Sequence, residues 1–225
     1  LTVNNTSGTP TVTLNNTAAF TWNGNLLLTA GTLVLANFTQ TIGGNVSGAG
    51  TLNASAITGG NSLTVSGYMG TNALAVGAVS APSSAVLNVG SDWNVTAFTP
   101  NGGTVVFTGV GTVYSATSFA NLTVNHAGST TANAAVTVTG NLGLTAGTLA
   151  MGANGLSVAG NITRAAGLIT STGTVTLNGT AAAQSANFTG STINNLTVNN
   201  TSGTPTVTLN NTAAFTWNGN LVLTA

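Results

Sequence analysis

The chain has almost no charge and no cysteine. Its 225 residues include one Lys or Arg, one Asp or Glu, one His and no Cys, and charged residues make up 1% of it, against about 25% in an ordinary soluble domain. Binding to nucleic acid needs many Lys and Arg side chains to displace counterions from phosphate, and Arg164 is the only one here. Metal sites need several converging Cys, His or carboxylate ligands, and a disulfide framework needs Cys. We therefore expect no nucleic-acid partner, no metal and no cofactor.

Long apolar runs are also missing. A membrane-spanning helix needs about 20 consecutive apolar residues, whereas Thr, Asn, Ser or Gly interrupts every apolar run of this chain within a few residues. Disordered chains combine low hydrophobicity with high net charge, but this chain has a mean hydropathy of +0.39 and a formal charge of zero. We expect a folded chain without membrane insertion. Its start at Leu1, without Met or a basic leader, favours a segment of a longer protein.

The strongest signal is an internal repeat. Residues 1–30 read LTVNNTSGTPTVTLNNTAAFTWNGNLLLTA, and residues 196–225 read the same, except that Val222 stands in the place of Leu27. Identity over this length indicates recent tandem duplication with an offset of 195 residues, from position 1 to position 196. We predict that residues 1–195 form one repeat unit of a continuous solenoid and that residues 196–225 begin the next, near-identical unit.

A weaker repeat lies within this unit. The sequence NLLLTAGTL of residues 25–33 recurs as NLGLTAGTL at residues 141–149 and begins again at residue 220. The two spacings are 116 and 79 residues and differ by 37 residues. That difference fits two added coils of a solenoid with roughly 20 residues per coil.

Short stretches of the chain have the period of a β-strand. Apolar and polar residues alternate in LTVN (1–4), TVTLN (11–15), LTVS (63–66) and TVTLN (174–178). Alternate side chains of a strand point to opposite faces, so one face is buried and the other is solvated. Val and Thr favour strands, and Gly and Asn favour turns. Turn pairs are predicted at Asn23-Gly24, Gly43-Gly44, Gly59-Gly60, Asn101-Gly102, Asn154-Gly155 and Asn178-Gly179.

These features predict an all-β fold, a parallel β-solenoid (β-helix) built from tandem repeats. Each coil of such a fold stacks on the preceding coil at a spacing of about 4.8 Å. Like residues then form ladders, with Val and Leu inside and Thr and Asn outside, and a scarcity of charge avoids stacking like charges. An immunoglobulin-like sandwich fits the uneven repeat spacing poorly. A transmembrane barrel is expected to carry aromatic girdles, and aromatic residues are only 5% of the chain.

The chain also resembles a known class of repetitive proteins. Its pattern SVAGNIT (157–163), GTVTLNG (173–179) and NLTVN (195–199) resembles the tandem β-strand repeats of giant bacterial secreted and surface proteins of the adhesin or autotransporter-passenger type. The resemblance covers nearly the whole chain. It implies a β-helical stalk or fibre located outside the cell or at the cell surface, and it supplies no catalytic residues.

Three ionisable side chains were considered for catalysis: Asp92, His126 and Arg164. Asp92 and His126 with a Ser residue would make up a hydrolytic triad, but the chain lacks the G-x-S-x-G nucleophile motif. The β-helical polysaccharide lyases and hydrolases bring several carboxylates into one groove, and one Asp is too few. We predict that the protein is not an enzyme and has no catalytic, cofactor-binding or metal-binding residues. We expect all three side chains at the surface, in less regular parts of the unit.

Tryptophans and asparagines are the remaining candidates for sugar contacts. Trp22, Trp93 and Trp217 are candidates for stacking on sugar rings, but Trp22 and Trp217 occupy one place in the repeat. Trp22 follows Phe20 by two residues, on the same face of the predicted strand, which favours a role in the core. N-glycosylation patterns begin at Asn37, Asn94, Asn121 and Asn161. Attached glycans stay an open alternative.

The sequence therefore predicts a structural protein, a segment of a long repetitive extracellular β-solenoid fibre or filament at the cell surface. Its expected partner is itself, through end-to-end stacking of coils and lateral bundling. The alternative is the stalk or a ligand-binding module of an adhesin, or an ice-binding solenoid whose Thr-x-Thr triplets match an ordered lattice. These triplets lie at residues 11–13, 137–139 and 174–176, and their irregular spacing disfavours a flat array.

Overall fold

The computed structural model describes residues 1–7, 10–181, 183–203 and 205–224. The described residues form 25 strands and no helix, and the fold is a parallel β-solenoid of about ten turns, which confirms the predicted fold class. Residues 8–9, 204 and 225 of the two repeat copies lie outside this description. The chain divides into two compact units, Leu1–Ser115 and Ala116–Ala225, called here the N-terminal and C-terminal units. The predicted repeat boundary at residue 195 concerns the sequence period and stays a prediction.

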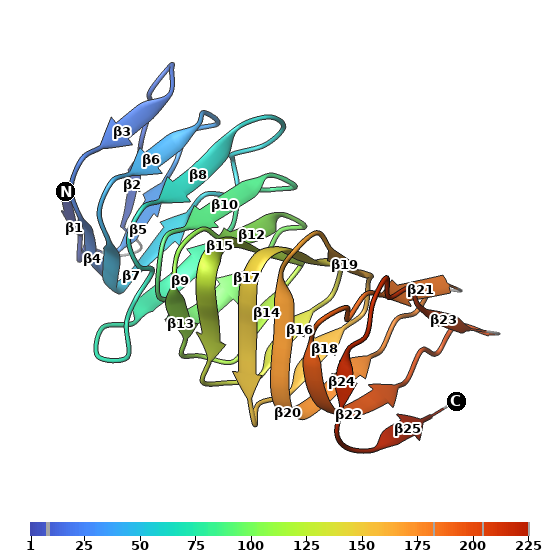
Figure 1. The fold of residues 1–225 in the computed structure, drawn as a ribbon. Helices are drawn as coiled ribbons and strands as arrows, with labels where there is room; N and C mark the ends of the chain where they lie inside the picture. Colours follow the sequence, from blue (N-terminus) through green and yellow to red (C-terminus); the bar gives the residue numbers. More distant parts are fainter. Residues whose placement is uncertain (8–9, 182, 204, 225) are drawn as a thin grey trace. The chain divides into compact units, whose positions relative to one another are not determined.

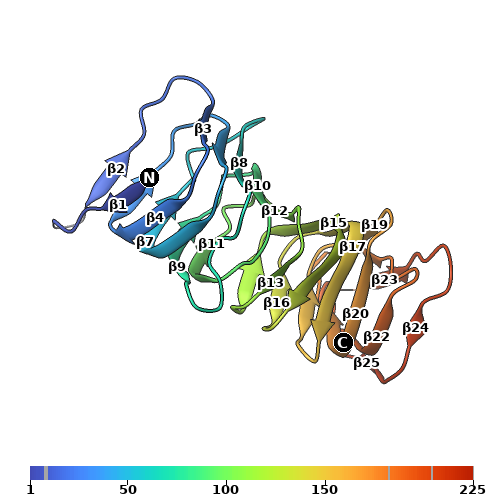
Figure 2. The same cartoon turned by 60° about the vertical axis from the view of Figure 1, so that its left-hand side comes forward.

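The N-terminal unit consists of three stacks of parallel strands (Figures 1 and 2). The first stack contains β1 (Thr2–Asn4), β4 (Leu26–Ala30), the start of β7 (Val46–Asn53), single-residue bridges at Met69 and Trp93, and β13 (Gly111–Val113). The second contains β2 (Thr11–Thr13), β5 (Thr32–Val34), the end of β7, β9 (Val76–Ser80) and β11 (Val95–Thr99). The third contains β3 (Phe20–Trp22), β6 (Gln40–Ile42), β8 (Ser62–Val65), β10 (Val86–Val89) and β12 (Thr104–Phe107).

The C-terminal unit has the same three-sided arrangement. One stack contains β14 (Thr117–Phe119), β16 (Val136–Val138), β18 (Leu156–Val158), the end of β20 (Leu168–Leu177), the end of β22 (Thr192–Val198) and β25 (Leu221–Leu223). Another contains the starts of β15 (Asn121–Ala132) and β17 (Leu142–Gly152), then β19 (Ile162–Arg164), β21 (Ala183–Ala186) and β23 (Thr206–Leu209). The last contains the ends of β15 and β17, the starts of β20 and β22, and β24 (Thr216–Trp217).

The coils differ in length although the strands stay in register. Val86 pairs with Thr104, 18 residues further along the chain, whereas Thr51 pairs with Ala78, 27 residues further on. The extra residues lie in the loops between strands, where a longer connection adds little entropic cost. Coil length is therefore not uniform along the chain.

Alternation along each strand places aliphatic side chains inside the coils. In the C-terminal unit Val138, Val158 and Leu177 stack on successive strands and are all buried. Between these inward residues, Thr137, Ser157 and Thr176 form a column on the outer surface. The predicted ladders are therefore present, and complete burial of a Val or Leu side chain contributes about 1.5–3 kcal/mol to stability.

A ladder of asparagines runs along one corner of the C-terminal unit, and a similar contact occurs in the N-terminal unit. The side-chain carbonyl of Asn121 accepts the backbone N–H of Asn141 at 2.9 Å, and that of Asn141 accepts the N–H of Asn161 at 2.8 Å. Asn25 accepts the N–H of Asn45 in the same way, at 2.9 Å. Each amide thus satisfies a backbone donor of the next coil at a bend where the strand ladder is interrupted.

Glycine serves two different purposes at bends of the chain, one at a predicted turn pair and one at a bend that was not predicted. At Asn101-Gly102 both residues have positive φ, 48° and 73°, as in the tight turns that Asn and Gly favour. At Gly90, in contrast, the requirement is close stacking, because a Cβ atom there would collide with the carbonyl oxygen of Ser66 on the preceding coil. Glycine is therefore needed at the second corner for its small size.

Candidate functional site

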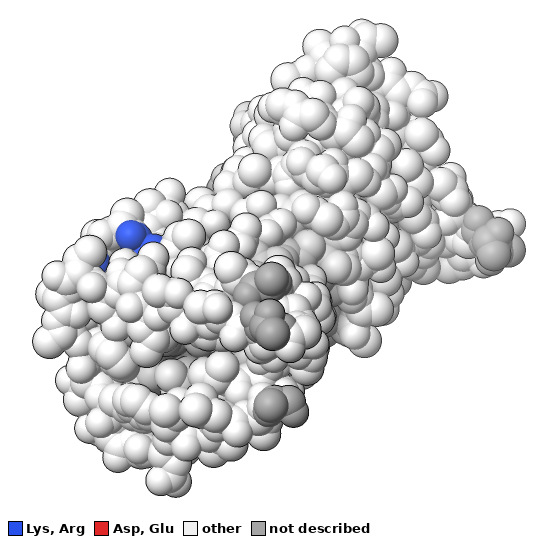
Figure 3. Space-filling view, turned by 90° about the vertical axis from the view of Figure 1, so that its right-hand side faces the viewer, with Lys and Arg blue, Asp and Glu red and all other residues white. Residues whose placement is uncertain are grey.

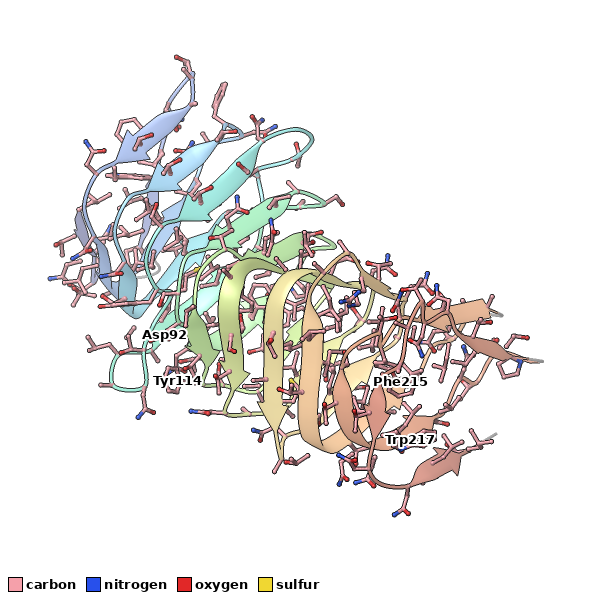
Figure 4. All side chains as sticks on the ribbon, in the orientation of Figure 1. Asp92, Tyr114, Phe215 and Trp217 are labelled. Carbon is pink, nitrogen blue, oxygen red and sulfur yellow. The ribbon has the colours of Figure 1, made fainter. Side chains whose placement is uncertain are left out.

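The three ionisable side chains make structural hydrogen bonds. Asp92, half-buried in the N-terminal unit (Figure 4), accepts the backbone N–H of Thr112 at 2.8 Å, a contact between successive coils. Arg164, half-buried at the end of β19, donates from Nε to the carbonyl of Gly167 at 2.8 Å and from Nη2 to the carbonyl of Ala166 at 3.3 Å. In Figure 3 the atoms coloured for Lys and Arg are the only coloured ones on a white surface. Arg164 stabilises the loop that follows its own strand.

His126 lies in the core, so the expectation of a surface position in a less regular segment is wrong for this residue. It is 8% exposed and lies within β15. Its Nδ1 lies 3.1 Å from the carbonyl oxygen of Ala127, and its Nε2 lies 2.9 Å from Thr130 Oγ1. Because a carbonyl oxygen only accepts, Nδ1 is the donor in the first of these contacts. Both ring nitrogens are thus engaged within the strand, while Asp92 lies in the other unit.

The tryptophans differ in how deeply they are buried. Trp93 is fully buried and makes edge-to-face contacts with Phe98 and Phe107, at ring-centroid distances of 4.9 and 6.3 Å. Trp22 and Trp217 each pair with a fully buried isoleucine, Ile42 and Ile193 respectively. Trp22 is nevertheless only half-buried and Trp217 is exposed. Each tryptophan is therefore paired with only one neighbouring described strand. For Trp22 that strand comes later in the chain, and for Trp217 it comes earlier.

The end of the C-terminal unit, residues 196–224, contains an apolar cavity, and we call this segment the open coil. The volume of the cavity is about 420 Å³. Figure 4 places Phe215 and Trp217 on this last part of the chain, and Phe215 packs against Phe188 with ring centroids 5.8 Å apart. The cavity is lined by Leu196, Val198, Asn200, Pro205, Val207, Leu209, Trp217, Leu221, Leu223 and Thr224.

The two copies of the repeat expose opposite faces of the same coil. Leu1 is 52% exposed, whereas its copy Leu196 is 1% exposed. The order reverses further along the repeat, because Leu26 is 1% exposed and Leu28 is fully buried, but their copies Leu221 and Leu223 are 47% and 70% exposed. Identical residues therefore become buried wherever a neighbouring coil covers them.

A second groove, of about 580 Å³, lies in the C-terminal unit. The ends of β15 and β17 and the starts of β20 and β22 contribute residues to it, including Thr131, Thr170 and Thr192. The Ser171 hydroxyl, which also lines this groove, is buried and makes no hydrogen bond to any residue that the structure describes. Thr170 and Thr192 pair on neighbouring strands, whereas Ala150 separates Thr131 from Thr170. Threonine hydroxyls of this kind can hydrogen-bond a polyhydroxylated ligand.

The Thr-x-Thr triplets do not stack on one another. Thr11 pairs with Thr32, but Thr13 pairs with Val34. Ser157 on β18 separates Thr137 from Thr176. Thr137, Ser157 and Thr176 thus form one regular column of hydroxyls. Among the described strands, however, no two of the three triplets lie on neighbouring strands.

The asparagines of the glycosylation patterns take part in hydrogen bonds. Asn94 donates from its side chain to the carbonyl of Thr71 at 2.7 Å, and Asn37 donates to Thr58 Oγ1 at 3.0 Å. Asn121 and Asn161 belong to the corner ladder, where Asn161 accepts the N–H of Ser185 at 2.8 Å. A glycan on Asn94 or Asn37 would have to replace these contacts, because it is attached to the donating nitrogen.

Among the described residues, no group of three or more His, Asp or Glu side chains is placed to hold a metal ion, and no helix has the length and apolar character needed to cross a membrane. Comparison of the chain with protein-family models, with curated proteins and with solved structures gives no match. The chain is thus described by its fold, a parallel β-solenoid of about ten turns.

Proposed function

We propose that this chain is a structural protein, a segment of a long repetitive β-solenoid fibre at the cell surface. The observation that carries the proposal is the opposite exposure of the two repeat copies. One copy of this coil packs against the coil that follows it in the chain, and the other copy packs against the coil that precedes it. A coil that can pack on both sides is suited to a continuous stack. Backbone hydrogen bonds to both neighbouring coils would give such a stack high kinetic stability.

The length of the molecule tests the proposal. If each 195-residue unit continues the solenoid, every added unit adds about nine coils at the mean coil length of the chain, or about 42 Å at a rise of about 4.8 Å per coil. We expect this increment in electron micrographs of chains with one, two and three units. A two-unit chain that is no longer than a one-unit chain would overturn the proposal.

A matched pair of substitutions tests whether the coil at the junction is continuous. In a two-unit chain, Leu223→Asp places a carboxylate at the inward position that its copy Leu28 occupies in the core, which is strongly unfavourable. Val222→Asp places it at the neighbouring outward position, where its copy Leu27 is exposed. We expect Leu223→Asp to interrupt the filament and Val222→Asp to leave its length unchanged.

The surface location is a separate part of the proposal. It is supported by the resemblance of the repeats to those of bacterial surface and secreted proteins. Antibodies against the chain should label intact producing cells as strongly as permeabilised ones. Labelling only after permeabilisation would place the protein inside the cell.

A ligand-binding module is the second candidate, favoured by the groove along β15, β17, β20 and β22, which several threonines line. A saccharide ligand would change the NMR signals of Thr131, Thr170 and Thr192 selectively. Thermal hysteresis in dilute solution would instead support ice binding. The absence of both effects would leave the structural role as the better proposal.

A further inference from the structure

Two Asn-Gly pairs of the C-terminal unit differ in how their backbones are held. The pairs are Asn154-Gly155 and Asn178-Gly179, and both lie outside the repeated residues 196–225. An asparagine followed by glycine can cyclise, because glycine has no side chain to hinder attack by its own backbone nitrogen on the neighbouring side-chain amide. The attack needs a glycine N–H that is free of hydrogen bonds, and the later hydrolysis needs access for water.

The Asn154-Gly155 pair meets both conditions. It lies in the bend between β17 and β18, where the N–H of Gly155 makes no hydrogen bond to any residue that the structure describes. Asn154 lines the groove of about 580 Å³, so water reaches this bend. A Cβ atom added at Gly155 would meet only the carbonyl oxygen of Thr174 among the described atoms, at 4.0 Å. The bend is therefore loosely packed around the attacking nitrogen.

The Asn178-Gly179 pair is held in the opposite way. The N–H of Gly179 donates to Oε1 of Gln184 at 3.1 Å, and Gln184 is only 3% exposed. Gly179 is itself buried, and a Cβ atom there would meet the carbonyl oxygen of Ala159 at 2.8 Å. The side-chain oxygen of Asn178 is also buried and has no hydrogen-bond partner among the described residues. Gln184 thus occupies the nucleophile, and burial keeps water from the amide.

We propose that Asn154 is a site of spontaneous deamidation and that Gln184 protects Asn178 from the same reaction. The backbone nitrogen of Gly155 bonds to Cγ of Asn154, and the side-chain nitrogen leaves as ammonia with the proton of the former N–H. Water then adds its hydroxyl to one of the two imide carbonyls and returns a proton to the backbone nitrogen. The product is an aspartyl or an isoaspartyl residue. Solvent water is the only co-reactant, and no electrons are transferred.

The reaction changes charge and backbone at a contact between coils. The chain has a formal charge of zero, and each event adds one negative charge. Asn154 Nδ2 donates to the carbonyl of Ala132 at 2.8 Å, and a carboxylate in its place would face that oxygen without a proton to share. An isoaspartyl linkage also lengthens the backbone before Gly155, whose carbonyl accepts the N–H of Val136 at 3.0 Å. We expect faster hydrogen exchange at the Val136 amide after modification.

The proposal goes beyond the fibre function and does not depend on it. A fibre with almost no ionisable groups would gain charge only as it ages, and it would gain it at defined positions. Every repeat unit that contains Asn154 would carry one such position, so the number of charges would rise with both age and length.

Water enriched in heavy oxygen tests the proposal on the folded 225-residue chain. The chain is incubated in mildly alkaline buffer made with this water, digested with pepsin at acid pH, and mapped by mass spectrometry. Only groups formed during the incubation carry the label, because water supplies the new oxygen. We expect Asn154 to be modified at least about tenfold faster than Asn178, since a hydrogen bond of ordinary strength must first break at Gly179.

A synthetic peptide of residues 151–158 provides the clock, because its sequence MGANGLSV contains the same pair without the fold. Equal rates at Asn154 and Asn178 in the folded chain would overturn the proposal. It would also be overturned if Asn154 of the folded chain were still unlabelled after the time in which the peptide is fully modified.

A glycine variant tests the chemistry at Asn154. Gly155→Ala adds a Cβ atom to a bend that has room for it, at a glycine whose φ is not positive. The methyl group hinders attack by the nitrogen of the same residue. Label at Asn154 should fall at least about tenfold, without a change in melting temperature. Undiminished label in this variant would show that attack by the backbone nitrogen is not the route.

A glutamine variant tests the protection of Asn178. Gln184→Met keeps a side chain of similar size but removes the amide oxygen that accepts the N–H of Gly179. The rate at Asn178 should rise at least about tenfold. Asn101-Gly102, in the N-terminal unit, is the control for a general loss of structure. A rise at Asn178 no larger than the rise at Asn101 would overturn the protective role of Gln184.

Discussion

The side chains of Gln40 and Gln184 are both buried, but of the two only the side chain of Gln184 makes hydrogen bonds to residues that the structure describes. Gln184 donates to the carbonyls of Val158 and Gly160, at 2.8 and 2.7 Å, and accepts the N–H of Gly179 at 3.1 Å. Neither side-chain amide atom of Gln40 has a hydrogen-bond partner among the described residues. A buried polar group without a partner loses its hydration without compensation.

This difference predicts opposite effects of the same substitution. Gln40→Leu should raise the free energy of unfolding by about 1–2 kcal/mol, because the neighbours in register, Phe20 and Leu63, are apolar. Gln184→Leu should lower it by about 2–4 kcal/mol, because it leaves the N–H of Gly179 without its acceptor and removes the amide donor from the carbonyls of Val158 and Gly160. Urea denaturation measures both values. A Gln40→Leu chain less stable than the natural one would contradict the argument.

Two glycines, one crowded and one with open space around it, test whether close stacking of coils requires glycine. Gly90→Ala should destabilise the protein by about 1–3 kcal/mol, because the new methyl group meets the backbone of Ser66 on the preceding coil. Gly24→Ala is the matched control, since no atom lies within 4 Å of the added Cβ. We expect it to change stability by less than about 0.5 kcal/mol. Equal melting temperatures for the two variants would count against close stacking at Gly90.

His126 shows where the sequence contained a signal that the prediction did not use. Leu122, Val124 and His126 follow one another at intervals of two residues and are all buried. Strand alternation therefore places the histidine on the inward face. The prediction placed it outside on the basis of residue type alone, and type is a weaker guide than position within a strand.

At the scale of elements, the asparagine ladder offers a direct test of the corners. Asn141→Ala removes the acceptor for the N–H of Asn161 and should cost about 1 kcal/mol. Asn141→Asp keeps an oxygen acceptor in the same place and should cost less. Hydrogen exchange at the Asn161 amide should be faster in the Ala variant than in the Asp variant. The same rate in both would show that the side chain does not protect this amide.

Short strands were predictable, but their grouping into three stacks was not. Alternation marks β8 and the end of β20 clearly, and Gly followed by Asn and an aliphatic residue marks corners at Asn45, Asn141 and Asn161. β15 and β17, however, run through a corner as continuous strands of 12 and 11 residues, so no turn signal separates their two halves. Which coil each strand pairs with depends on loop lengths, and these follow no local pattern.

The open coil could not be recognised from the sequence alone. Its residues match those of a half-covered coil at every position but Val222, and only the packing distinguishes Leu223 from Leu28. The duplication itself was visible, and it identifies the pairs of residues that make the comparison possible. The candidate site is thus a property of position in the stack and not of residue type.

At the scale of the whole molecule, the scarcity of ionisable groups predicts an unusual indifference to solution conditions. Stability depends on pH only through groups that bind protons differently in the folded and unfolded states, and the chain has one Asp or Glu, one His and one Lys or Arg. We expect the melting temperature to stay nearly constant between about pH 3 and pH 9, and also on addition of salt. A strong dependence on either, measured by circular dichroism, would contradict this expectation.

The regular spacing of the corner ladder has a consequence for how such a protein evolves. Asn121, Asn141 and Asn161 are separated by 20 residues each, and the coil between two of them begins and ends at the same kind of corner. Unequal recombination between the corresponding codons would add or remove one whole coil and leave the remaining corners able to bond as before. A gene of this kind can change the reach of its product in small, heritable steps, without inventing any new contact.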